Sequence, residues 1–297
     1  MSQFVSQKNV PVTSMEKGKG YEAFYSNSER MESTEYHSHD FYEFYLHIHG
    51  GQYFGIDSSL YRLEPYQLFI IPPFSMHGLS NIGELQNYER AYLNLSLETL
   101  KTLGCGQINL DGFFRSYTSR GLYTFQMTRE DAQKCASQII QLKNSDQMED
   151  PVEQFKLCGI LIDFLNSMCM GIRQSKQTTE NVVSNSIIQD VLAYINTHYT
   201  QPLKIDQLAK TFGISVSYLS HEFARFTNRS VYEYILYRRV MLAQQLMQGE
   251  ETLNGIAYQC GFNDYSNFLR IFNKIVGVSP SAYRKQLAKF SQSGQVS

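Results

Sequence analysis

Hydrophobic and polar positions alternate with a period of two in several short stretches between residues 21 and 95. Short stretches rich in Tyr, Phe and Ile are separated by turn residues such as Gly50-Gly51 and Pro72-Pro73. This pattern is typical of half-buried strands, and many of them at close spacing predict a β-barrel or a sandwich. The expected strands cover residues 21–25, 41–48, 52–56, 60–63, 68–71 and 88–95, with one more hairpin expected within 112–122.

The period then changes to that of helices. Residues 128–143 and 152–172 carry apolar side chains at helical spacing, and the second stretch is apolar around much of its circumference. Such a helix can cover the barrel, contact a second copy of the chain, or do both. The segment that follows is rich in Gln, Ser, Thr and Asn, which is typical of a linker between domains.

The C-terminal third contains one helix-turn-helix pattern twice. In the first copy Leu208 and Phe212 are spaced i, i+4. Gly213 can end that helix in the left-handed conformation, and Ser215 can cap the next one. The pattern returns about fifty residues later. Helix, tight turn and helix is the arrangement that places the second helix in the DNA major groove. The helix expected at 231–247 would span roughly 25 Å at ~1.5 Å per residue, enough to hold two recognition helices about one DNA turn (~34 Å) apart.

A helical wheel separates apolar from polar positions in the second helix of each copy. The apolar side chains share one face and are expected in the core. On the opposite face Arg can pair with guanine, Asn with adenine, and Ser or His can donate or accept. The candidate DNA-reading residues are Ser217, Ser220, His221 and Arg225 in the first copy and Ser266, Asn267, Arg270, Asn273 and Lys274 in the second. For each of these residues the alternative is a polar face that is simply exposed to solvent. That alternative has the least support for Arg270, which lies at the centre of its face.

This C-terminal part resembles the DNA-binding domain of the AraC/XylS family of bacterial transcription regulators. The residues that carry the resemblance are 205–226, Arg238, Arg239, Ala243, Leu246 and, above all, 255–284. The resemblance implies sequence-specific binding to double-stranded DNA, control of carbohydrate uptake or catabolism genes, and most often activation through RNA polymerase. It also implies a dimer interface on the helix at 152–172. The candidate contact residues there are Phe155, Leu161, Ile162 and Leu165.

Three positions depart from the family pattern. Lys204 stands where a capping Ser or Thr is usual. Gly255 replaces an acidic residue, at a cost of about 1 kcal/mol in helix propensity. Asn273 stands where Lys is common, which removes one expected phosphate contact. None of the three changes the assignment.

A cluster of histidines and a carboxylate marks the first half of the chain. On an extended strand the odd-numbered His37, His39 and Glu43 share one face. Together with Pro72-Pro73 and His77 they resemble the two motifs of cupin barrels, the fold of AraC-type sensor domains, although Tyr66 stands where the second motif usually has Gly. The resemblance implies the ligand set of metal-binding cupins, and imidazole with carboxylate suits several first-row metals. The metal candidates are His37, His39, Glu43 and His77.

Three interpretations of this cluster stay open. The favoured one is a small-molecule pocket without a metal or other cofactor, in which carboxylate, imidazole, guanidinium and phenol groups orient sugar hydroxyls. Its candidate residues are His39, Glu43, Tyr45, His77, Arg90 and Tyr92. The second interpretation is the metal site. In the third, the polar groups are satisfied within the barrel or exposed at its rim.

Charge is divided unevenly along a chain whose net charge is −2. From residue 185 onward there are 11 Lys and Arg against 7 Asp and Glu, net +4, and the remainder has 15 against 21, net −6. The basic half fits DNA, but its excess is modest, so tight binding is expected to need both helix-turn-helix copies and a dimer.

The five cysteines form no CxxC pair, and neither a signal peptide nor a transmembrane run is visible, which favours a cytoplasmic protein.

The expected fold is α+β with two domains. The boundaries are 1–20 for a mobile arm, 21–125 for a cupin-like barrel, 126–173 for accessory or dimerisation helices, 174–186 for a linker, and 187–290 for an all-α tandem helix-turn-helix domain. The expected function is effector-responsive transcription activation, without enzymatic activity or a membrane partner. The rivals are a virulence or stress regulator without a small-molecule ligand, and a metal-dependent cupin enzyme fused to a DNA-binding module.

Overall fold

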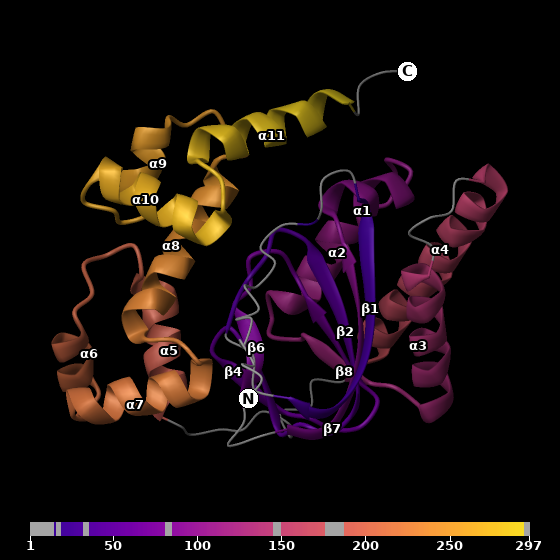
Figure 1. Cartoon of the computed structure of the whole chain (residues 1–297), viewed down its shortest axis with the longest axis horizontal. Coiled ribbons are helices and arrows are strands. Elements are labelled where there is room, and N and C mark those ends of the chain that lie inside the picture. Colours follow the sequence, from indigo (N-terminus) through magenta and orange to yellow (C-terminus); the bar gives the residue numbers. More distant parts are fainter. Residues whose placement is uncertain are drawn as a thin grey trace, which may run out of the picture.

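The computed structural model describes residues 15, 19–31, 36–80, 85–144, 150–175 and 187–293. The predicted arm and linker lie almost wholly outside these residues. A β-rich part comes first along the chain and an all-helical part second (Figure 1). The described strands are β1 (Tyr21–Met31), β2 (Tyr42–His49), β3 (Tyr53–Ile56), β4 (Ser59–Arg62), β5 (Gln67–Ile71), β6 (His77–Ser80), β7 (Leu85–Leu95) and β8 (Thr124–Gln126).

The strands form two antiparallel sheets, with the orders β1-β7-β2-β5-β8 and β4-β3-β6. Side chains alternate between the faces of the larger sheet, as the period of two predicts. Phe44 and Leu46 of β2 enter the core beneath the outer helices, while Tyr45 faces the smaller sheet. The register pairs Tyr45 with Tyr92 of β7 and with Phe69 of β5, so aromatic rings fill the space between the sheets.

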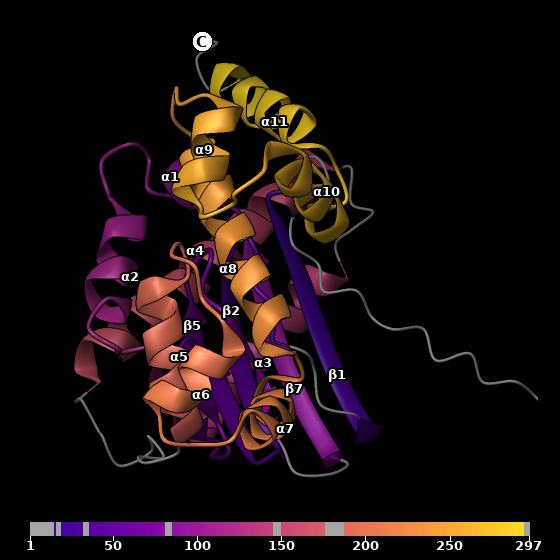
Figure 2. The same ribbon diagram turned by 90° about the vertical axis from the view of Figure 1, so that its left-hand side faces the viewer.

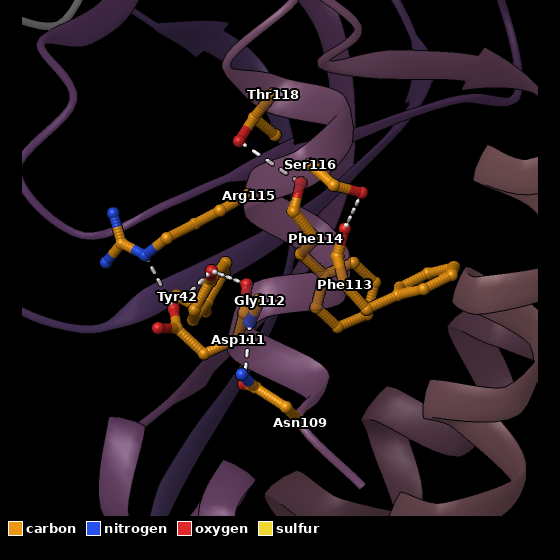
Figure 3. A network of polar contacts seen from close by, with 9 residues as sticks. All are labelled: Tyr42, Asn109, Asp111, Gly112, Phe113, Phe114, Arg115, Ser116 and Thr118. Atoms are coloured by element: carbon orange, nitrogen blue, oxygen red, sulfur yellow. Dashed lines mark hydrogen bonds and ion pairs between the residues drawn. The ribbon is translucent and has the colours of Figure 1, made fainter.

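Helices cover the outer face of the larger sheet, beginning with α1 (Leu97–Leu103) and α2 (Leu110–Thr118). The hairpin expected within 112–122 is therefore wrong. Asn109 caps α2 by accepting the backbone N–H of Gly112 at 2.8 Å, and Phe114 is fully buried in the core. The Tyr42 hydroxyl donates to Asp111 at 2.8 Å, which fixes α2 on β2 (Figure 3). Capping and burial of one face together favour a helix here.

Two longer helices, α3 (Arg129–Lys143) and α4 (Pro151–Gln174), confirm the helices expected after the barrel. One face of α4 belongs to the core beneath the sheet, where Leu161 and Leu165 are each only 3% exposed. The opposite face carries Phe155, 80% exposed, and Ile162, 54% exposed. By length and composition alone, α4 is the one described helix that could cross a membrane, contrary to the expectation of no such run. Its buried face is instead packed against protein.

The C-terminal part consists of helices connected by short turns (Figures 1 and 2). Their bounds are α5 (Ile187–His198), α6 (Ile205–Thr211), α7 (Val216–Thr227), α8 (Val231–Leu246), α9 (Leu253–Gln259), α10 (Tyr265–Val276) and α11 (Pro280–Ser293). As predicted, Gly213 is left-handed after α6 (φ 66°), and Ser215 caps α7 by accepting the N–H of Tyr218 at 3.1 Å. Lys204 makes no side-chain cap at the start of α6, in line with its departure from the family pattern.

This helical part has two hydrophobic cores rather than one. The first core joins α5, α6, α7 and the start of α8, including Tyr234. The second joins the rest of α8, including Val240, to α9, α10 and α11. Helix α8 is thus common to both cores, and each core belongs to one helix-turn-helix unit. We call these two helix-turn-helix units the first unit and the second unit.

Candidate functional site

The outward face of α7 carries the residues expected to read DNA in the first unit. Ser217, Ser220, His221 and Arg225 are all exposed, whereas Leu219 is fully buried on the other face. Arg225 forms an ion pair with Glu222 one turn earlier. The guanidinium must therefore exchange a carboxylate partner for DNA if it is to contact a duplex.

The outward face of α10 carries the corresponding residues of the second unit. Ser266, Arg270, Asn273 and Lys274 are exposed, and Asn267 is half-buried. Arg270 donates to the side-chain oxygen of Asn267 at 3.0 Å, which holds both groups at the same surface. Asp264 caps the helix by accepting two backbone N–H groups. The helical-wheel assignment of faces is confirmed.

Arg238 and Arg239, which carry part of the family resemblance, are engaged inside the protein. Arg238 pairs with Asp57 of the barrel at 3.2 Å. Arg239 donates to the carbonyl oxygens of Tyr199 at 2.7 Å and Gln201 at 2.9 Å, which ties α8 to the end of α5. These two cations hold the fold together in this arrangement.

The histidine cluster predicted from the sequence forms at one end of the barrel. One ligand atom from each of His37, His39, Glu43 and His77 lies within 4.8 Å of the other three. We call these four residues the Glu43 cluster. The carboxylate Oε2 of Glu43 is 3.1 Å from Nε2 of His39 and 3.6 Å from Nε2 of His77. All but His37 are buried.

The second nitrogen of each buried imidazole is used to orient the ring. Nδ1 of His39 lies 2.9 Å from the carbonyl oxygen of Phe41, and Nδ1 of His77 lies 3.0 Å from that of Ser75. A carbonyl oxygen can only accept, so in a neutral ring Nδ1 carries the proton and Nε2 presents a lone pair towards Glu43. This is how histidines that bind metals are commonly oriented.

The electrostatics of the Glu43 cluster favour a charged partner. Burial lowers the pKa of His39, although its contact with Glu43 opposes that shift. Burial alone would raise the pKa of Glu43, but its contacts with the imidazoles of His39 and His77 hold that pKa well below its ordinary value. The carboxylate is therefore ionised, and Nε2 of His77 is a buried atom without a hydrogen-bond partner among the described residues. A cation or a polar ligand at this point would satisfy both groups.

The six residues predicted to bind an effector fall into two groups. His39, Glu43 and His77 belong to the Glu43 cluster. Tyr45 stacks on Tyr92 with ring centroids 6.3 Å apart, and its hydroxyl is hydrogen-bonded to that of Tyr88. The Arg90 guanidinium lies 5.0 Å from the centre of the Tyr88 ring. A cavity of about 560 Å³ lies elsewhere, between β8, α3 and α4, and none of the six residues lines it.

A set of contacts between the barrel and the helical part was not foreseen from the sequence. The ring of Tyr36 is fully buried against the first unit, 6.1 Å from that of Phe226. Its backbone N–H donates to Thr227 at 2.9 Å, and its carbonyl accepts from the guanidinium of Arg229. Asp40 accepts from the Tyr283 hydroxyl at 3.1 Å, and burial raises the pKa of Asp40 to about 6.

A sequence signal for these contacts exists in two glycines. Gly55 of β3 and Gly78 of β6 are direct neighbours in the smaller sheet. A Cβ atom at Gly55 would lie 1.2 Å from the Tyr36 hydroxyl oxygen, and one at Gly78 would lie 2.9 Å from the same ring. Glycine in a strand often marks a close approach of this kind, although it does not say what approaches.

Both parts of the chain are similar to known proteins. Two family models match, an AraC-like ligand binding domain over residues 19–151 and a helix-turn-helix domain over residues 208–286. The regulatory protein SoxS of Escherichia coli K12 is 38% identical over 34% of this chain and 95% of its own length. The uncharacterized regulator YdiP of the same organism is 35% identical over 34% of this chain, but the match spans only 33% of YdiP. The solved DNA-binding domain of AdpA, in complex with a target DNA, is 23% identical over 38% of this chain and all of its own, with a TM-score of 0.35.

Proposed function

Because the chain belongs to the AraC family of DNA-binding transcription regulators, and its relatives are regulators rather than enzymes, we propose that it reads a specific DNA sequence through α7 and α10. The observation that carries the proposal is the outward polar face of both helices, each the second helix of its unit. Serine, asparagine and arginine at these positions can reach base edges in a major groove. The residues proposed to do so are Ser217, Ser220, His221, Arg225, Ser266, Asn267, Arg270, Asn273 and Lys274.

Arg270→Ala tests direct reading of a base. If Arg270 pairs with a guanine edge, we expect a loss of about 1–3 kcal/mol in binding to the preferred site and relaxed selection at one base pair. Binding is measured by mobility shift on a fragment selected from a random library by the wild-type chain, and on random duplex. Arg173→Ala, which removes an exposed arginine of the sensor, is the control. An equal loss on both duplexes would make Arg270 a phosphate contact.

We propose further that the barrel senses a small effector at the Glu43 cluster, with a carbohydrate as the first class to test. An ionised carboxylate, two oriented imidazoles, Arg90 and stacked tyrosines are groups that orient hydroxyls and cover an apolar sugar face. The aromatic packing around Tyr45 leaves little room, so an effector would have to enter at the end of the barrel where the Glu43 cluster lies or displace side chains. A thermal-shift screen with sugars is the direct test, and a response to none would favour a regulator without a small-molecule ligand.

Glu43→Gln and His77→Ala test the location of the sensor site. Each is expected to abolish the influence of any sugar found in that screen, because Glu43 supplies the negative charge and His77 the free ring nitrogen. DNA binding in the absence of the sugar should stay within about twofold of wild type, since neither residue faces DNA. A variant that still responds at the wild-type sugar concentration would move the site away from the Glu43 cluster.

A divalent metal is the second candidate ligand of the same site, favoured by the orientation of His39 and His77. Their Nδ1 atoms face backbone carbonyls, so both Nε2 atoms face the carboxylate. His37, His39, Glu43 and His77 would hold the ion, whose positive charge would satisfy the buried carboxylate. Imidazole with carboxylate suits several first-row metals and does not select one of them.

The assembly we propose is a homodimer that acts in the cytoplasm as an activator contacting RNA polymerase. The dimer is supported by the exposed face of α4, where Phe155 and Ile162 are placed at helical spacing. The predicted interface needs one correction: Leu161 and Leu165 are buried within the subunit and are not accessible to a second copy. The control of carbohydrate genes rests on the family resemblance alone.

A further inference from the structure

One edge of the larger sheet ends at the cavity between β8, α3 and α4. Among the described strands β8 pairs with β5 alone, so its second edge faces away from the sheet. Residues 124–128 line the cavity on this side, and the C-terminal half of α4, including Asn166 and Gln174, lines it on another. None of the four residues of the Glu43 cluster lines it. The cavity is therefore separate from the proposed sensor site.

The hydrogen bonds between β5 and β8 show which backbone groups lie on the outer edge. The N–H of Met127 donates to the carbonyl of Tyr66 at 3.0 Å, and the carbonyl of Tyr123 accepts an N–H of β5 at 2.7 Å. In an antiparallel pair, residues that bond to the neighbouring strand alternate with residues that do not. Thr124 and Gln126 occupy the alternate positions, so their backbone N–H and C=O groups point away from β5.

This outer edge has little to bond with inside the protein. Within the described residues its one partner is the hydroxyl of Ser175, which is 3.5 Å from the carbonyl oxygen of Thr124, at the outer limit of a hydrogen bond. Unpaired N–H and C=O groups at a sheet edge form a template on which a further strand can pair. Thr124 and Gln126 are two residues apart, ~6.6 Å along the strand, which is the repeat of an extended chain.

The walls of the cavity suit the remaining groups of a peptide. Amide side chains can both donate and accept hydrogen bonds, as a peptide group requires. Those that line the cavity are Gln67, Gln126, Gln138, Asn166 and Gln174. Met127 and Met170 add flexible apolar surface that can adapt to different side chains. The volume of about 560 Å³ lies within the ~300–1,000 Å³ of small-molecule sites.

A carboxylate beyond the end of β8 gives a bound peptide its direction. Lys134 is paired with Asp163 at 2.8 Å, whereas Asp131, in the first turn of α3, has no ion-pair partner among the described residues. Because Thr128 caps α3, Asp131 follows closely after the C-terminal end of β8. All described strand pairs in the larger sheet are antiparallel. A further strand added in the same sense has its amino end near Asp131.

We propose that this cavity is a second ligand site, which binds a short peptide as an added strand on the edge of β8. The backbone groups of Thr124 and Gln126 hold the main chain of the peptide, and Asp131 pairs with its free amino terminus. In sites of this kind main-chain pairing gives affinity, and pockets for alternate side chains give specificity. The site uses neither the Glu43 cluster nor α7 and α10, so it goes beyond the function proposed above and does not depend on it.

Gln126→Pro and Gln126→Ala form a matched pair that tests the backbone edge. Both remove the same side chain, but only proline removes the N–H, and this N–H is not part of the ladder with β5. The probe is a synthetic library of tetrapeptides with free amino termini, from which the full wild-type chain selects peptides that are then made singly. By calorimetric titration of the tightest one, we expect Gln126→Ala to bind within about threefold of wild type and Gln126→Pro to lose about tenfold.

Hydrogen exchange in the wild-type chain keeps the test independent of whether the proline variant folds. The selected peptide should slow exchange at the amides of Thr124 and Gln126 at least about tenfold, because both become hydrogen-bonded. Retention of no tetrapeptide, equal binding by the two Gln126 variants, or unchanged exchange at these two amides would overturn the site.

Acetylation of the peptide tests its direction. Removing the positive charge of the amino terminus, or replacing Asp131→Asn, should each weaken binding about threefold to tenfold. The two changes together should weaken it no more than either one alone, because both remove the same interaction. Equal binding of the acetylated and the free peptide would overturn the pairing with Asp131.

Discussion

Replacing Phe155 and Ile162 together by glutamate should yield a folded monomer whose affinity for its DNA site falls by about 10²–10⁴. Both side chains are largely exposed on α4, so the new charges enter water in the monomer and would enter an apolar contact in a dimer. The loss of affinity is large because pairing two modules makes the second binding event intramolecular. Sedimentation reports the oligomeric state, and a mobility-shift titration reports the affinity.

Leu161→Glu combined with Leu165→Glu is the informative counterpart on the same helix. These two leucines are buried beneath the sheet, so the charges should unfold the sensor rather than separate two copies. Loss of the cooperative thermal transition in this pair, with its retention in the Phe155/Ile162 pair, would show that one face of α4 is needed for folding and that the other face is not. A dimer that survives the exposed-face substitutions would place the interface on another surface.

Adding Ni²⁺ or Zn²⁺ to metal-free protein should increase the free energy of unfolding by ~2.7 kcal/mol at a free metal concentration 100 times the Kd, if the Glu43 cluster holds an ion. The increase should vanish in His77→Ala and in His37→Ala. His37 is only half-buried, which makes that variant the safer one for folding. His49→Ala removes an exposed histidine of the same barrel and is the control. Equal stabilisation of the wild type and all three variants would point to binding at surface histidines.

The DNA-binding part was predictable because its signals are local. Gly213 and Ser215 fix one helix end and the next helix start within three residues, and this needs no knowledge of the rest of the chain. The outward faces of α7 and α10 follow from periodicity in the same way. The alternation around Glu43 also grouped His37 and His39 with this carboxylate, because residues two apart on a strand share a face. His77 was added to the set only by the resemblance to the second cupin motif.

Other features depend on contacts between distant residues and were missed. The strand β8 and the helix α2 are short, and their periodicity is too brief to separate helix from strand. On α4 both faces are apolar, so the sequence alone could not tell that Leu161 faces the core and Phe155 faces solvent. The docking of Tyr36 on the first unit joins residues about 190 positions apart, as in its contact with Arg229.

The neighbouring glycines of β3 and β6 have a consequence for protein engineering. A Cβ atom added at either glycine would collide with Tyr36, whose ring packs in the core of the first unit. A chimera that joins this DNA-binding part to the sensor of another regulator would need glycine at the same two sheet positions and an aromatic residue packed against them. Recombination at the interdomain boundary should therefore succeed most often when Gly55, Gly78 and Tyr36 are transferred as one set.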